Sequence, residues 1–208
     1  MTNSTRPARS RHFAAVLAPA LCLAAVLASC GGGSPLDNPA PVSNAPLGTS
    51  GQKLSYVYYQ KCINPIFLAR LSGSAQAGNT CAGAGCHDNA TGTGGAFRVI
   101  PSAQAVDVSN PANTPDAIRA SDMYKNFYSA QGETVIGSPS ESRLLNKPLL
   151  NGVLHGGGQV IASSQDPSAQ LIQYWISHPV PQGQDEFSTA ANSLFTPADA
   201  NTGACNTQ

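Results

Sequence analysis

The stretch that decides the fold is NTCAGAGCHDN, residues 79–89. It places Cys81 and Cys86 around the four small residues Ala-Gly-Ala-Gly, with His87 directly after the second cysteine. Thiols and an imidazole in one short loop suit three kinds of chemistry: a disulfide, a metal site, or covalent attachment of a prosthetic group. Features elsewhere in the sequence are needed to decide among these three kinds of site.

The N-terminal residues are typical of an exported protein. Three arginines precede an apolar run, residues 13–28, which is too short and too interrupted for a bilayer span and matches a secretory signal. The following LASC, residues 27–30, resembles the lipobox of bacterial lipoproteins. That resemblance implies a signal peptide over residues 1–29 and a lipid on Cys30 as the first mature residue. Because glycine rather than aspartate comes next, it also implies a periplasm-facing or outer-membrane location.

Composition argues against a nucleic-acid-binding protein and indicates a linker. Charged residues make up only 11% of the chain and the formal net charge is zero, without the basic face that nucleic acids require. Residues 30–52 are mostly Gly, Pro, Ser and Asn and bury too little apolar surface to fold, so we predict a flexible linker. Loss of the signal leaves an excess of acidic residues, which favours partners with a basic docking surface.

The histidine after Cys86 raises the possibility of a haem. In c-type haem sites two cysteines form thioethers and the adjacent histidine binds the iron, usually in the spacing C-x-x-C-H. Here the spacing is C-x4-C-H, and helix positions five apart point about 140° away from each other, so the insert must bulge. Gly83 and Gly85 can adopt the positive φ angles that a bulge needs. The spacing alone leaves a disulfide or zinc open, although zinc requires further ligands nearby.

The flanking segments predict helices. Residues 53–71 carry apolar residues at helical spacing until Pro65, which we expect to break the run and which can begin a new turn. Three later helices are predicted near residues 115–130, 139–146 and 167–178, each after an N-cap residue and a proline: Thr114, Ser138 and Asp166. Ser138 with Glu141 also has the spacing of a capping box.

Together these features resemble class I cytochrome c domains, in which an N-terminal helix leads into the haem motif and a last helix crosses it. SPSESRLLNKPLLNGVLHGGG, residues 138–158, resembles a recurrent stretch of exported bacterial cytochrome-c-like domains. The last predicted helix carries Trp175 in an apolar face, as the C-terminal helix of that family does. The resemblance covers roughly residues 54–180. It implies a mainly α, cytochrome c-like small helical domain with long loops over residues 53–180.

The same resemblance implies one covalent haem c, with thioethers from Cys81 and Cys86 and His87 as the proximal iron ligand. The distal ligand of the family lies on the loop before the last helix, where this chain has His155. Met123 is the alternative, although a methionine inside a predicted helix also suits core packing. A third option is an open distal position.

Of the six cysteines, Cys22 would leave with the signal peptide, so two remain after these assignments, Cys62 and Cys205. In an exported chain they are the natural disulfide, which would tie a C-terminal extension, residues 181–208, back to the first helix. Closing a loop of that length stabilises the fold by roughly 4–5 kcal/mol.

The favoured function is single-electron transfer by an exported lipoprotein, anchored to the membrane by its lipid and serving redox protein partners rather than acting as an enzyme. The alternative is a haem-free binding or structural lipoprotein stabilised by two disulfides, one of them Cys81–Cys86. A third hypothesis is a haem peroxidase or gas-binding domain with an open distal site. No nucleophile–base spacing typical of a hydrolase is visible.

Overall fold

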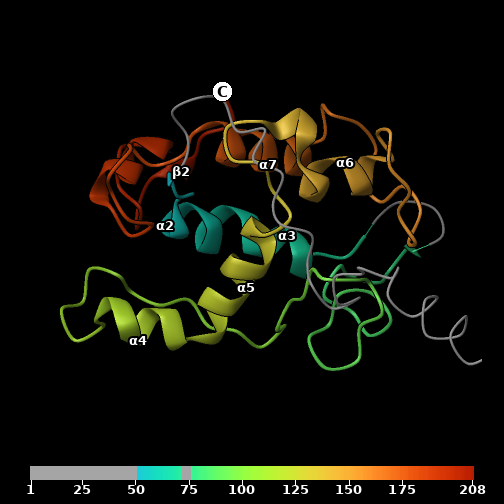
Figure 1. Cartoon of the computed structure of the whole chain (residues 1–208), viewed down its shortest axis with the longest axis horizontal. Coiled ribbons are helices and arrows are strands. Elements are labelled where there is room, and N and C mark those ends of the chain that lie inside the picture. The colour runs from blue at the N-terminus through green and yellow to red at the C-terminus, as the bar shows by residue number, and fades with distance from the viewer. Residues whose placement is uncertain (1–50, 72–75) are drawn as a thin grey trace, which may run out of the picture. The chain divides into compact units, whose positions relative to one another are not determined.

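The computed structural model describes residues 51–71 and 76–208. The predicted signal peptide, Cys30 and nearly all of the linker lie outside the described residues. The elements in chain order (Figure 1) are α2 Tyr56–Tyr58, a π-helical turn Tyr59–Ile63, α3 Asn64–Leu68, α4 Pro115–Ala120, α5 Asp122–Gln131, a 3₁₀ turn Pro139–Glu141, α6 Arg143–Leu149, α7 Pro167–Ser177, a 3₁₀ turn Thr189–Leu194, β1 Phe195–Thr196 and β2 Ala204–Cys205.

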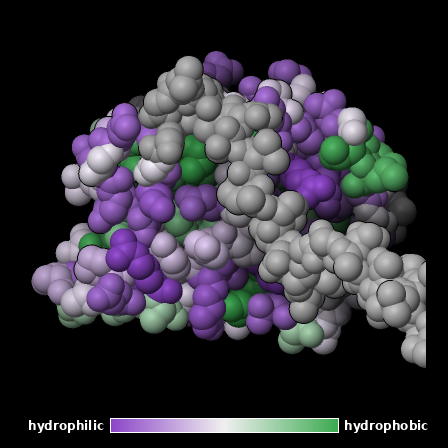
Figure 2. Space-filling model, in the orientation of Figure 1, coloured by the Kyte–Doolittle hydropathy of each residue, from purple (hydrophilic) through white to green (hydrophobic). Residues whose placement is uncertain are grey.

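The described part of the chain is mainly α, as predicted. It has six α-helices and one antiparallel pair of two-residue strands, β1 and β2. None of its helices combines the length and apolar character that crossing a bilayer requires. The face drawn in Figure 2 is largely hydrophilic, with apolar side chains gathered in small patches.

A continuous helical segment, residues 56–68, begins the folded part. Ser55 caps it, because its Oγ accepts a hydrogen bond at 3.1 Å from the backbone N–H three residues on. The expectation that Pro65 breaks the run is wrong, because the helical segment continues through it, but the expectation that it can begin a new turn is confirmed. Pro65 lies in the first turn of α3, where a missing N–H is tolerated. The π-helical turn precedes it, with the N–H of Asn64 donating to the carbonyl of Tyr59.

Helix α7 forms where predicted and packs against this first segment. Asp166 caps α7 by accepting the N–H of the residue two positions on at 2.8 Å. The indole N–H of Trp175 donates to the Ser55 carbonyl at 3.0 Å, and its ring lies 5.4 Å from that of Tyr59. Phe127 of α5 meets Tyr59 edge-on at 5.5 Å. These rings are buried, so they fix the last helix, the first segment and α5 together.

The helix predicted over residues 115–130 is divided at Ser121 into α4 and α5. Thr114 caps α4 as predicted, with its Oγ1 accepting a backbone N–H at 3.3 Å. Ser121 is extended, and its Oγ caps α5 by accepting the Tyr124 N–H at 3.1 Å. A serine hydroxyl competes in this way with the helical backbone, which explains the break.

The predicted capping box of Ser138 and Glu141 is wrong. Ser138 makes no side-chain cap, a 3₁₀ turn follows it, and α6 begins only after that turn. The hydroxyl that organises this corner belongs to the buried Ser142. It donates to the Ser138 carbonyl and accepts the Val135 N–H, both at 2.9 Å.

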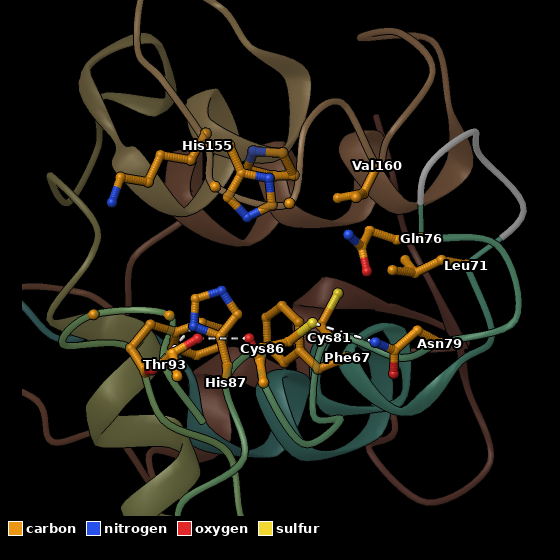
Figure 3. A pocket seen from close by; sticks show the side chains of 18 of the residues that line it. Phe67, Leu71, Gln76, Asn79, Cys81, Cys86, His87, Thr93, His155 and Val160 are labelled. Carbon is orange, nitrogen blue, oxygen red and sulfur yellow. Dashed lines mark hydrogen bonds between the residues drawn. The ribbon is translucent and has the colours of Figure 1, made fainter. Parts of the chain in front are cut away.

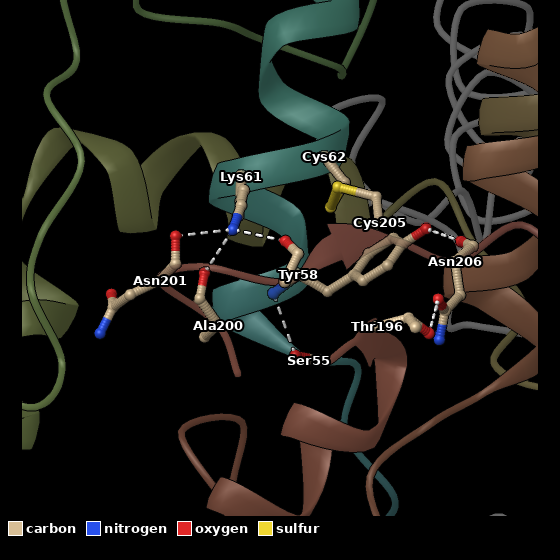
Figure 4. The surroundings of a disulfide bond; sticks show 10 residues. Ser55, Tyr58, Lys61, Cys62, Thr196, Ala200, Asn201, Cys205 and Asn206 are labelled. Atoms are coloured by element: carbon tan, nitrogen blue, oxygen red, sulfur yellow. Dashed lines mark hydrogen bonds between the residues drawn. A yellow bond between two sulfur atoms is a disulfide. The ribbon is translucent and has the colours of Figure 1, made fainter. Parts of the chain in front are cut away.

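The C-terminal segment, residues 181–208, packs on the first helical segment. The predicted disulfide between Cys62 and Cys205 is present, with Cα atoms 6.1 Å apart (Figure 4). Phe195 is buried against the same helix. Lys61 donates to three carbonyls of the segment at 2.7–2.9 Å: those of Ala200, Asn201 and Gly203. The segment is therefore held by covalent, apolar and polar contacts at once.

Candidate functional site

A cavity of about 540 Å³ lies between two walls of different origin (Figure 3). One wall comes from α3 and residues 79–97, and the other from α6 and residues 155–160. Cavities that hold cofactor-sized molecules have roughly 300–1,000 Å³. Four of the sequence-predicted site residues line this cavity together: Cys81, Cys86, His87 and His155.

His87 is clamped on the first wall. Its Nδ1 lies 3.1 Å from the carbonyl oxygen of Phe97, and the two rings are 4.8 Å apart. Gly94 makes room for the imidazole, because a Cβ at that position would come within 2.6 Å of the ring. Burial, and after it nearby basic groups, lower the pKa of His87, so the ring is held in the neutral form that binds metals.

His155 faces His87 from the second wall. Its Nδ1 lies 2.6 Å from the carbonyl oxygen of Gly158, within the same loop. In both histidines the backbone carbonyl engages Nδ1, which leaves Nε2 for a ligand. Figure 3 shows the two rings pointing toward each other across the cavity.

The two rings are spaced to share one metal ion. Their centres are 6.2 Å apart and their planes differ by 7°. A metal ion binds an imidazole nitrogen at about 2 Å, and that nitrogen lies roughly 1 Å from the ring centre, so an ion held end-on by both rings separates the centres by about 6 Å. Within residues 51–71 and 76–208, no three His, Cys, Asp or Glu side chains are grouped to hold one ion.

Cys81 and Cys86 lie on the His87 side of the cavity (Figure 3) and are not bonded to each other. The insert between them folds into tight turns: Gly85 has φ +81°, as expected of a bulge, whereas Gly83 does not use a positive φ. Burial raises the pKa of the Cys81 thiol to about 11, so it stays protonated at neutral pH. Asn79 donates to the Cys86 sulfur at 3.5 Å.

The other candidate ligands lie elsewhere. Met123 is 3% exposed in α5 and does not line the cavity, so it serves as a core residue. His178 is exposed at the end of α7, where its ring stacks on Tyr174 at 4.0 Å. Of the two distal candidates, only His155 reaches the cavity.

Three charged cavity residues were missed from the sequence. Arg143 and Lys147 lie one turn apart on α6, and Glu133 precedes that helix. The i, i+4 spacing of the two cations was the available signal, because such residues share a helix face. Arg143 and Lys147 give the second wall a positive edge beside an otherwise largely apolar lining.

The site thus offers two facing imidazoles and two unpaired thiols around one cavity. If a metal-carrying group were bound here, the two imidazoles would hold its metal ion and the two thiols could bond to the group itself. Comparison with known proteins found no match, neither to a protein family nor to a curated protein or a solved structure.

Proposed function

We propose that this protein carries single electrons on one covalently bound haem c. In this proposal Cys81 and Cys86 form the thioethers, His87 is the proximal iron ligand and His155 the distal one. When bound, the haem supplies a one-electron couple between ferric and ferrous iron. The protein's own residues orient it, exclude water from one face and set its potential.

The spacing of the two imidazoles is the observation that carries the proposal. Ring centres 6.2 Å apart, with both Nδ1 atoms engaged by carbonyls, suit two axial ligands of a single ion. Both thiols lie on the His87 side, as a C-x4-C-H attachment motif requires. The packing of α7 on the first helical segment through Trp175 is in keeping with the cytochrome c resemblance.

A bis-histidine pair predicts a low reduction potential. A methionine ligand favours ferrous iron and raises the potential, whereas a second imidazole does not. The carbonyl contacts of Nδ1 would strengthen electron donation from each imidazole to a bound metal ion, which would further stabilise the ferric state. We expect partners of correspondingly low potential.

The proposal also includes export of the protein and its attachment to a membrane by a lipid. A signal peptide over residues 1–29 and a lipid on Cys30 would place the domain at the periplasmic or outer-membrane surface. A disulfide such as Cys62–Cys205 forms and persists in that oxidising compartment. Residues 30–52 would then be the tether from which the domain reaches redox protein partners.

The test is a pyridine haemochrome spectrum of the full chain, produced with c-type maturation machinery. We expect a covalent c-type spectrum that Cys86→Ala alters, and that stays unchanged in His178→Ala. The imidazole planes of His87 and His155 differ by only 7°, so they would bind a ferric iron in nearly the same orientation, and we expect a rhombic low-spin electron paramagnetic resonance signal. A colourless protein with a Cys81–Cys86 disulfide in its mass spectrum would instead support the haem-free alternative.

A further inference from the structure

The two facing histidines differ in the number of hydrogen bonds and packing contacts that hold them in place. The N–H of His87 donates to the Cys81 carbonyl at 2.9 Å, and its carbonyl accepts the N–H of Val99 at 2.7 Å. Its ring also packs against Phe97, which is itself buried. His87 is thus fixed through its backbone on both sides and through its ring, and it adjoins Cys86 in the chain.

His155 belongs to a loop that is attached only at its base. We call residues 150–158 the distal loop. Among the described residues, positions 152–157 form no hydrogen bond with anything outside this loop. The bonds they do form are local: His155 Nδ1 to the Gly158 carbonyl, and the Gly158 N–H to the His155 carbonyl at 2.9 Å. A local turn of this kind can move as a unit without breaking its own bonds.

The distal loop also buries little apolar surface. Leu154, next to His155, is 93% exposed, and Leu150 is 41% exposed. Leu150 has φ +55°, a left-handed conformation that costs about 1–2 kcal/mol in a residue with a side chain. Loops with few buried contacts and few external hydrogen bonds open at the low end of the local stability range. Moving His155 out of the cavity therefore disrupts much less than moving His87.

We propose that the distal loop makes His155 a displaceable ligand, so that a small neutral diatomic molecule can take its place. The inference rests on the proposed haem. His155 would leave with its protonation unchanged, the incoming molecule would take the place it vacates, and neither a proton nor an electron would be transferred.

Part of the wall on the His155 side is apolar, and the cations Arg143 and Lys147 of α6 line the cavity beside that part. Val160 lies on the His155 side of the cavity (Figure 3), and α6 adds Leu144 and Pro148. These side chains offer no hydrogen-bonding group, so they suit an apolar diatomic molecule of the size of carbon monoxide. Binding of such a molecule would then displace the second histidine, His155, from the site.

Displacement has a kinetic signature. If His155 must leave first, binding becomes limited by its departure, and the observed rate levels off as ligand concentration rises. Removing the His155 imidazole should abolish that limit. In His155→Ala the position is open, so the rate should grow linearly with concentration and exceed the parent rate by roughly tenfold or more.

The experiment mixes the reduced, haem-loaded full chain with carbon monoxide in a stopped-flow spectrometer. The parent protein and His178→Ala, a histidine outside the cavity, should both give a saturating rate, and His155→Ala a linear one. A parent protein that has a c-type haemochrome spectrum but never binds carbon monoxide overturns the inference while sparing the proposed function. A linear parent rate equal to that of His155→Ala also overturns it.

Hydrogen exchange gives a readout that does not depend on ligand binding. In the haem-loaded protein, amides of residues 152–157 should exchange well before those of His87 and Val99, which are hydrogen-bonded. Equal protection of the two segments would contradict the inference. A chain that fails to take up haem at all would fail the proposed function first, and the haemochrome spectrum identifies that case.

Discussion

Removal of the Cys62–Cys205 disulfide should lower the stability of the domain more than any other change of two side chains. The bond joins residues 143 positions apart. In the chain-entropy model, opening a loop of this length destabilises the folded state by about 5 kcal/mol. Because whole domains are stable by only about 5–15 kcal/mol, Cys62→Ala/Cys205→Ala should fall near the limit of folding at 37 °C.

Urea unfolding of the parent and the double variant measures this loss. The variant should unfold at much lower urea, and with a steeper slope, because its denatured chain is no longer closed and exposes more surface. Reducing agent should reproduce the effect in the parent and leave the variant unchanged. A loss below about 1 kcal/mol with an unaltered slope would refute the reasoning, since the loop would then not restrict the unfolded chain.

Three further changes test other contacts. Gly94→Ala places a Cβ within 2.6 Å of the motif histidine ring, so thermal unfolding should show a loss of about 1–3 kcal/mol, whereas Gly156→Ala, with open space around it, should change little. Glu186 is buried, which by itself raises its pKa, but its hydrogen bonds to a guanidinium and a phenol lower the pKa overall. Its stabilising effect is therefore present above the ordinary carboxyl pKa and lost as pH falls through the lowered value, and Glu186→Gln should flatten the stability profile measured in that acid range. Lys61→Met removes three charge-assisted bonds to carbonyls and should cost about 1–3 kcal/mol in urea unfolding, against about 0.5 kcal/mol or less for the exposed ion pair lost in Lys125→Met.

Local signals predicted the parts of the fold that depend on neighbours in the chain. The caps at Thr114 and Asp166, the last helix and the mainly α class follow from residue type and spacing. The pairing of Cys62 with Cys205 followed from counting thiols in a chain predicted to be exported. Each of these inferences needed only the chemistry of neighbouring residues or a count of the cysteines.

Features decided by distant contacts escaped the sequence. Ser142 precedes α6, but its hydroxyl accepts the Val135 N–H seven residues back instead of capping the helix, and no local pattern predicted that contact. The space that Gly94 leaves for the His87 ring depends on how residues 85–97 fold, and no local pattern predicted it. The sequence did place His155 on a loop before the last helix, but its alignment with His87 depends on how α6 packs.

The covalent bond between residues 62 and 205 has a consequence for protease attack. Every residue that lines the cavity lies between these two positions, so both walls belong to one closed ring of chain. A single cut in the exposed distal loop would leave the two pieces joined, each at a high effective concentration relative to the other. A nicked molecule should therefore migrate as two fragments only after reduction, and should keep both cysteines and both histidines of the cavity in one particle.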